Sequence, residues 1–119
     1  MNFERSNLVF QCFRAHLDIC FSNLVIRDSF VSDLFHNNII DESEAAALYA
    51  KPSHLTHNSD RVIFLLQLLR TNLNLIKFLN YLRTKPDSPD TDHYYVAHRV
   101  SSTIAKFADL VQFLPAENN

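Results

Sequence analysis

The chain has 119 residues, 47% of them hydrophobic, with a formal net charge of -2 at pH 7. This length suits one domain with one core, since domains of roughly 100 to 150 residues are the commonest size. The 11 Lys and Arg residues do not outnumber the 13 Asp and Glu residues, so the chain lacks the basic excess typical of nucleic-acid binding. We therefore expect no nucleic-acid partner.

No segment is suited to crossing a membrane or to directing secretion. Apolar runs such as residues 62–66 are far shorter than the ~20 residues of a transmembrane helix. Polar and charged residues interrupt the apolar residues between positions 3 and 21, which is unlike a signal peptide. We expect an intracellular, cytoplasmic protein with no membrane partner.

The sequence contains no Gly and only 4 Pro, so it has little of the turn chemistry that β-hairpins need, and we predict an all-α fold. Apolar residues three and four positions apart predict a first helix over residues 3–24. A second helix is predicted to begin at a capping Asp28 or Ser29. It is predicted to end at Asn37 and Asn38, because Asn tolerates a left-handed backbone.

A third helix is predicted to begin with a capping box at Asp41. The Asp41 carboxylate can accept from the first free amides of the helix, and Glu44, three residues later, can reach back to the Asp41 amide. We expect this helix to be short and to end near Ala50, because Pro52 follows.

A fourth helix is predicted to follow the irregular residues 52–58, with Asn58, Ser59 or Asp60 as its cap. Its apolar residues occupy nearly all sides, which predicts that it is the central helix. These residues are Val62, Ile63, Leu65, Leu66, Leu68 and Leu69.

A fifth helix is predicted from about residue 73 to 85, where Pro86 and Pro89 stop it. A last segment, residues 91–114, has a heptad-like apolar stripe. We expect the stripe to pack on its own domain, because it covers fewer than three heptads; the alternative is that it contacts a partner. The stripe consists of Ala97, Val100, Ile104, Phe107, Val111 and Leu114.

Residues that could carry catalysis or bind metal lack the necessary pattern. Cys12 and Cys20 are eight residues apart, about 12 Å along a helix, which is beyond disulfide reach, so we expect reduced core thiols. The histidines form neither a His-Glu-x-x-His motif nor a site with a Cys-x-x-Cys pair, and His16 is expected to be a partly buried packing residue. Oxyanion holes and phosphate loops commonly rely on Gly-rich turns. We therefore expect no enzyme activity, small-molecule substrate, metal ion or cofactor.

Charges are segregated along the chain. Residues 28–44 contain five acids and no Lys or Arg, and residues 61–85 contain five bases and no acid. Such runs are usually solvated helix faces. The acids are Asp28, Asp33, Asp41, Glu42 and Glu44, and the bases are Arg61, Arg70, Lys77, Arg83 and Lys85.

Four segments in this order resemble a caspase recruitment domain of the death-fold superfamily. They are DSFVSDLF at residues 28–35, IIDESEAAAL at 39–48, RVIFLLQLLR at 61–70 and IKFLNYLR at 76–83. The resemblance implies a six-helix antiparallel bundle over residues 1–100, with an extended or additional C-terminal helix and tail over 101–119. A sister death-fold subfamily is an alternative.

The resemblance implies two further details of the backbone. The first helix of the family is often bent, here near Cys12 or at Ser22 and Asn23. Between the fourth and fifth helices, Thr71 and Asn72 stand where the family commonly has Gly, and Asn is the next-best residue for a positive φ.

The resemblance also implies a function, that of an adaptor in apoptotic or innate-immune signalling. Its partner would be another caspase recruitment domain, in a caspase prodomain, a scaffold or an adaptor, or a second copy of this chain. In the family's commonest contact, acids on the second and third helices meet bases on the first and fourth, which here are Arg14 and Arg61. Arg70 and Lys77 complete the predicted basic surface, which faces the acidic surface of Asp28, Asp33, Asp41, Glu42 and Glu44.

The chain could be a stand-alone regulator or the N-terminal part of a larger caspase, scaffold or receptor. An alternative function needs no such resemblance: an unrelated helical bundle could be a structural or regulatory subunit that oligomerises through its C-terminal helix.

Overall fold

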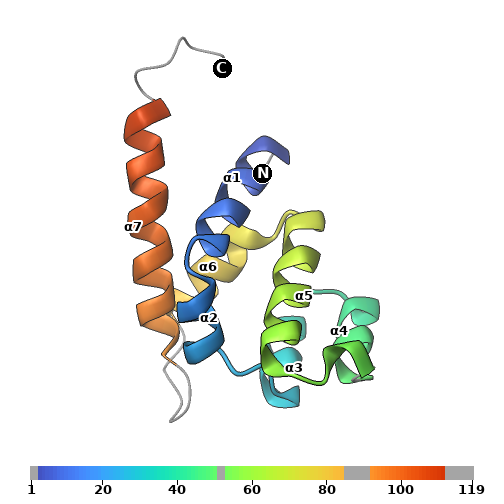
Figure 1. Ribbon diagram of the computed structural model, residues 1–119. Helices are drawn as coiled ribbons and strands as arrows, with labels where there is room; N and C mark the ends of the chain where they lie inside the picture. The colour runs from blue at the N-terminus through green and yellow to red at the C-terminus, as the bar shows by residue number, and fades with distance from the viewer. Residues whose placement is uncertain (1–2, 51–52, 85–91, 112–119) are drawn as a thin grey trace.

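The computed structural model describes residues 3–50, 53–84 and 92–111, and all of its regular elements are helical (Figure 1). Within these residues there is no strand, which confirms the predicted all-α class. The α-helices are α1 (Phe3–Arg14), α2 (Leu17–Asn23), α3 (Asp28–His36), α4 (Glu42–Tyr49), α5 (Asn58–Thr71), α6 (Leu75–Thr84) and α7 (His93–Val111), with a 3-10 turn η1 (Ser53–Leu55).

The first predicted helix is bent at Ala15 and His16, which divide it into α1 and α2. The bend lies between the two predicted positions, near Cys12 and at Ser22 and Asn23. The His16 amide bonds to the Phe13 carbonyl at 3.0 Å, a tighter turn than the α-helix, and the His16 carbonyl then accepts from the Cys20 amide at 3.0 Å. The bend keeps Cys12 and Cys20 fully buried on both sides of it. If α1 and α2 are counted as one bent helix, the described residues contain six α-helices.

The capping box of α4 is confirmed, because the Asp41 Oδ1 accepts from the Glu44 amide and the Glu44 Oε1 accepts from the Asp41 amide, each at 2.8 Å. The predicted caps of the second and fourth helices are wrong. The N-cap positions of α3 and α5 are Arg27 and His57, and neither side chain makes a capping bond.

The Asn58 side chain does not cap α5, because it forms hydrogen bonds to a distant part of the backbone instead. Its Nδ2 donates to the Leu24 carbonyl at 2.7 Å, and its Oδ1 accepts from the Ile26 amide at 2.8 Å. Backbone groups in the connection between α2 and α3 need such partners, since the chain there is not helical. Asn58 thus ties the start of α5 to that connection.

Two residues other than glycine adopt a left-handed backbone conformation. Asn38 has φ 60°, as predicted for the end of the second helix. After α5 the positive φ of 65° falls on Leu73 and not on Asn72, whose φ is -86°. The Asn72 side chain is engaged elsewhere, because its Nδ2 donates to the Ile39 carbonyl at 3.2 Å and its Oδ1 accepts from the Asn74 amide at 3.0 Å.

α5 packs against α1, α2, η1 and α6, as expected of a central helix. Its core side chains Val62, Leu65, Leu66 and Leu69 are at most 2% exposed. Not every apolar residue of α5 lies in the core, because Ile63 is 39% exposed. α6 lies within the predicted fifth helix, whose Lys85 and following prolines are outside the described residues.

α7 is one extended helix that continues without a break through residues 100 and 101, and it packs on α6, α1 and α2 (Figure 1). Val96, Ala97 and Val100 are fully buried, and Ile104 packs partly against the core. The first half of the predicted stripe therefore packs on its own domain. Phe107 is 39% exposed, and Leu114 lies outside the described residues.

Candidate functional site

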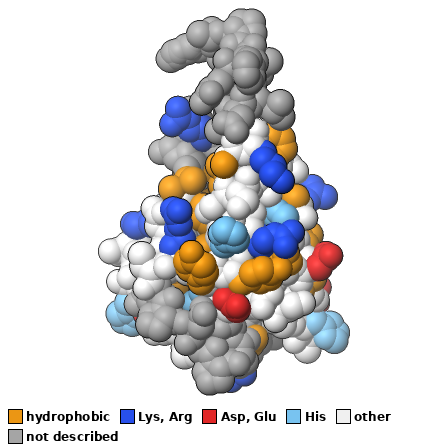
Figure 2. All heavy atoms as spheres, turned by 90° about the vertical axis from the view of Figure 1, so that its left-hand side faces the viewer, with side chains coloured by type: hydrophobic (Ala, Val, Ile, Leu, Met, Phe, Trp, Pro, Cys, Tyr) orange, Lys and Arg blue, Asp and Glu red, His pale blue; other side chains and the backbone are white. Residues whose placement is uncertain are grey.

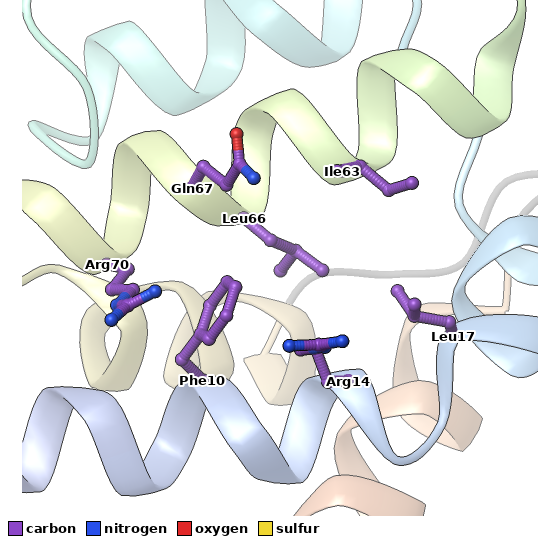
Figure 3. Close-up of a pocket in the computed structure, with 7 residues that line it drawn as sticks. All are labelled: Phe10, Arg14, Leu17, Ile63, Leu66, Gln67 and Arg70. Carbon is purple, nitrogen blue, oxygen red and sulfur yellow. The ribbon is translucent and has the colours of Figure 1, made fainter.

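α1 and α5 run in opposite directions and enclose a pocket of about 290 Å³ (Figure 3). Near one end, the Ser6 hydroxyl of α1 donates to the Arg70 carbonyl of α5 at 3.1 Å. The pocket is lined by Phe10, Arg14, Leu17, Ile63, Leu66, Gln67 and Arg70. It brings together Arg14 and Arg70, two residues of the predicted basic surface that are 56 positions apart.

The two arginines lie on either side of the Phe10 ring (Figure 3). The Arg70 guanidinium lies 4.8 Å from the centre of that ring, which is within the range of a cation-π contact. Arg14 is exposed, and neither guanidinium forms an ion pair with another described residue. The pocket therefore combines two uncompensated positive charges with an apolar lining.

Sequence reasoning missed the apolar part of this pocket. In each helix, the spacing of the residues that line the pocket could have indicated that they share one face. In α5, Ile63, Gln67 and Arg70 are spaced so that they share one helix face, and Ile63 is the exposed apolar residue of that face. Phe10 and Arg14 share a face of α1 in the same way.

α3 and α4 pack against each other, so the five predicted acids do lie on neighbouring helices or at their starts. Asp28, Asp41 and Glu42 are exposed. Hydrogen bonds from the Glu44 amide and the Ser43 side chain lower the pKa of the Asp41 carboxyl, which stays ionised as the helix cap.

The other two acids contact residues beyond α3 and α4. The Asp33 Oδ2 accepts from the Tyr81 hydroxyl of α6 at 2.5 Å. Burial and this bond raise the pKa of Tyr81. Glu44 is half-buried and accepts from the Asn72 Nδ2 at 3.2 Å in addition to its capping bond. Asp33 and Glu44 therefore help to hold α3 and α4 against the rest of the bundle.

Arg61 is not on the surface, contrary to the prediction. It is 8% exposed, and its two terminal nitrogens donate to the carbonyls of Ile26 and Leu48, the latter at 2.8 Å. The buried Nε has no hydrogen-bond partner among the described residues. Arg61 therefore joins the connection before α3 to the end of α4 by giving both carbonyls a hydrogen-bond donor.

Lys77 is also away from the pocket. Its Nζ donates to the Asn38 carbonyl at 3.2 Å, which places it against the turn between α3 and α4. The predicted basic surface is thus divided, with Arg14 and Arg70 at the pocket, Arg61 in the interior and Lys77 beside the acidic helices.

The outer side of α7 carries mixed chemistry, and Figure 2 shows hydrophobic, basic and histidine side chains interspersed on that side of the molecule. Many of its groups contact one another. Tyr94 stacks on His98 with ring centres 6.3 Å apart, and the Arg99 guanidinium lies 5.9 Å from the Tyr95 ring. This side therefore presents neither a single charge nor a continuous apolar surface.

Both cysteines are free and fully buried, as predicted. Burial raises the pKa of Cys12, and it raises the pKa of Cys20 to about 12. A thiol in this state is a poor nucleophile, because the thiolate is the reactive form.

His16 is half-buried, as predicted, and its Nε2 lies 2.6 Å from the Thr103 hydroxyl of α7. Burial, and then the positive charges of Arg99 and Lys106, lower the pKa of His16, while Asp18 opposes them. His16 therefore joins the bend between α1 and α2 to α7.

Two other kinds of feature are absent from the described residues. No group of three or more His, Cys, Asp or Glu side chains in that part of the chain is arranged to hold a metal ion. None of the helices within it combines the length and the apolar character needed to cross a membrane.

Comparison with protein-family models, with curated proteins and with solved structures finds no match to this chain.

Proposed function

We propose that this chain is a death-fold interaction module of the caspase-recruitment type, which assembles with like domains through surfaces of opposite charge. In this role it is an adaptor in apoptotic or innate-immune signalling, and it needs no catalytic site. The observation that carries the proposal is the pocket between α1 and α5, where Arg14 and Arg70 are uncompensated. The acids that would meet them, Asp28, Asp41 and Glu42, are exposed on α3 and α4.

The order of the helices supports the same proposal. A bent first helix, two short helices carrying acids, a long central helix, a fifth helix and an extended last helix correspond to the six-helix plan that the sequence resembles. The predicted basic surface changes in one residue. Arg61 is buried, so Arg70 is the base that α5 contributes to the surface.

Surface charges of this kind determine which partner binds and how fast, more than how tightly. An exposed ion pair contributes only ~0 to 1 kcal/mol, so one contact between two copies is expected to be weak. A head-to-tail contact whose rotation does not close on itself produces a filament, in which each subunit is held by several contacts. Assembly is therefore expected to be cooperative and sensitive to salt.

Charge reversal on the exposed residues tests the proposal. Arg14→Glu with Arg70→Glu removes the basic surface, and Asp28→Lys with Glu42→Lys removes the acidic one. Each double variant should lose self-association in sedimentation velocity, while its melting temperature stays close to that of the wild type. A mixture of the two variants should form pairs without filaments, because each variant retains one intact surface.

Arg83→Glu is the matched control, since Arg83 is exposed on α6 and outside the pocket. It should associate like the wild type. Association should also weaken between low and physiological salt, where the screening length falls to about 8 Å. Binding and salt dependence that survive all four reversals would show that these charges are only solvated surface.

A further inference from the structure

The pocket between α1 and α5 has two chemically different ends. Arg70 and Phe10 lie at one end, Leu17 and Ile63 lie toward the other, and Arg14 and Leu66 lie between these two ends (Figure 3). Ile63 is 39% exposed, so apolar surface remains in contact with water. A carboxylate alone would pair with the arginines and leave this apolar end unfilled. The pocket fits an occupant that offers an aromatic ring next to a carboxylate.

Several aromatic side chains are exposed among the described residues, and most of them already contact a basic or histidine group. Phe35 lies 5.4 Å from the His36 ring, and Tyr94 and Tyr95 contact His98 and Arg99. Phe107, which is also exposed, directly follows Lys106 on α7. Tyr49 differs from all of these. It is 41% exposed, it ends α4, and α4 contains no Lys, Arg or His.

Arg61 links the end of α4, where Tyr49 lies, to the residues just before Asp28, an exposed acid. Its guanidinium binds the carbonyl of Leu48, the residue before Tyr49, and also the carbonyl of Ile26, two residues before Asp28. The end of α4 and the start of α3 are therefore held together by one buried side chain. An aromatic ring and a carboxylate on rigid neighbouring helices lose little conformational entropy when they bind.

We propose that the Tyr49 ring of one copy inserts into the apolar end of this pocket in a second copy, while Asp28 of the first copy pairs with Arg14 of the second. This inference rests on the proposed function and adds a hydrophobic anchor to its charge pairing. Buried tyrosines are among the side chains that most often dominate the affinity of an interface. The insertion would bury the exposed Ile63 at the centre of the contact.

Because the chain contains no Trp, a Tyr49→Trp variant carries a single fluorescent indole. On association at low salt, its emission should move to shorter wavelength, since the indole leaves water. The shift should be absent in a Tyr49→Trp, Ile63→Glu double variant, in which a charge occupies the apolar end of the pocket.

Truncation measures the contribution of the ring. Tyr49→Ala should weaken self-association by ~30-fold or more, which is the scale of an interface hot spot. Tyr49→Phe, which keeps the ring, should stay within about 3-fold of the wild type, as expected when the ring's apolar area carries the contact. Tyr94→Ala is the matched control, because it removes the same side chain from α7, where it is 62% exposed. Dichroism and thermal unfolding of each variant verify the fold.

The outcomes separate this inference from the proposed function. If the charge reversals abolish association but Tyr49→Ala does not weaken it and the indole emission does not move, the insertion is wrong and the charge pairing stands. If Phe35→Ala causes the loss that is expected of Tyr49→Ala, the anchor is assigned to the wrong ring. A wild-type chain that remains monomeric at every concentration reached would overturn both proposals.

Discussion

Replacing Arg61 with Met should destabilise the fold by about 2 to 4 kcal/mol. The change removes two charge-assisted hydrogen bonds, to the carbonyls of Ile26 and Leu48, each worth about 1.5 to 3 kcal/mol. It also removes the buried Nε, which has no partner among the described residues and costs about 1 to 3 kcal/mol in the wild type. Methionine is shorter than arginine but unbranched and apolar, so it fills part of the space without burying a charge.

Urea unfolding followed by far-ultraviolet dichroism measures this change, which should also lower the melting temperature by about 10 °C for a domain of this size. Arg14→Met is the matched control and should change stability by less than about 0.5 kcal/mol, because Arg14 is exposed. If Arg61→Met is as mild as the control, Arg61 does not hold α4 to the connection before α3.

Three other predictions concern the core and the bend. Leu69→Ala should cost ~2 to 5 kcal/mol in the same unfolding experiment, because Leu69 is fully buried in the central helix; a loss below 1 kcal/mol would contradict that position. Cys12 and Cys20 should resist alkylation at pH 8 until the chain unfolds, since burial raises the pKa of both thiols; fast labelling of the native protein would refute this. Burial and the nearby Arg99 and Lys106 lower the pKa of His16 below its ordinary 6.5, so stability should fall as the pH drops below about 6.5; His16→Gln should reduce that loss in pH-dependent thermal unfolding, and an unchanged profile would refute the lowered pKa.

Local patterns in the sequence predicted the helices and several of their ends. The capping box of Asp41 and Glu44 and the left-handed Asn38 depend on atoms only a few residues apart, so neighbouring side chains suffice to specify them. The burial of Cys12 and Cys20 followed from the three-and-four spacing of apolar residues, which assigns a residue to one helix face whatever that face later contacts.

The roles of polar side chains were decided by the tertiary structure. Asn58 could cap its own helix or bond to a distant backbone, and the packing of α5 beside the α2–α3 connection selected the second. The Asn72 side chain likewise bonds to the Ile39 carbonyl and to the Asn74 amide, and the positive φ falls on Leu73.

The candidate surface shows the same division most clearly. Sequence alone identified the segregation of acids and bases, because charge is a property of each residue type. It could not distinguish Arg61 in the interior from Arg14 and Arg70 at the pocket, or place Lys77 beside the acidic helices. The exposure of a charge depends on which carbonyls, rings and helices surround it, and residues far apart in the chain supply those neighbours only when the bundle packs.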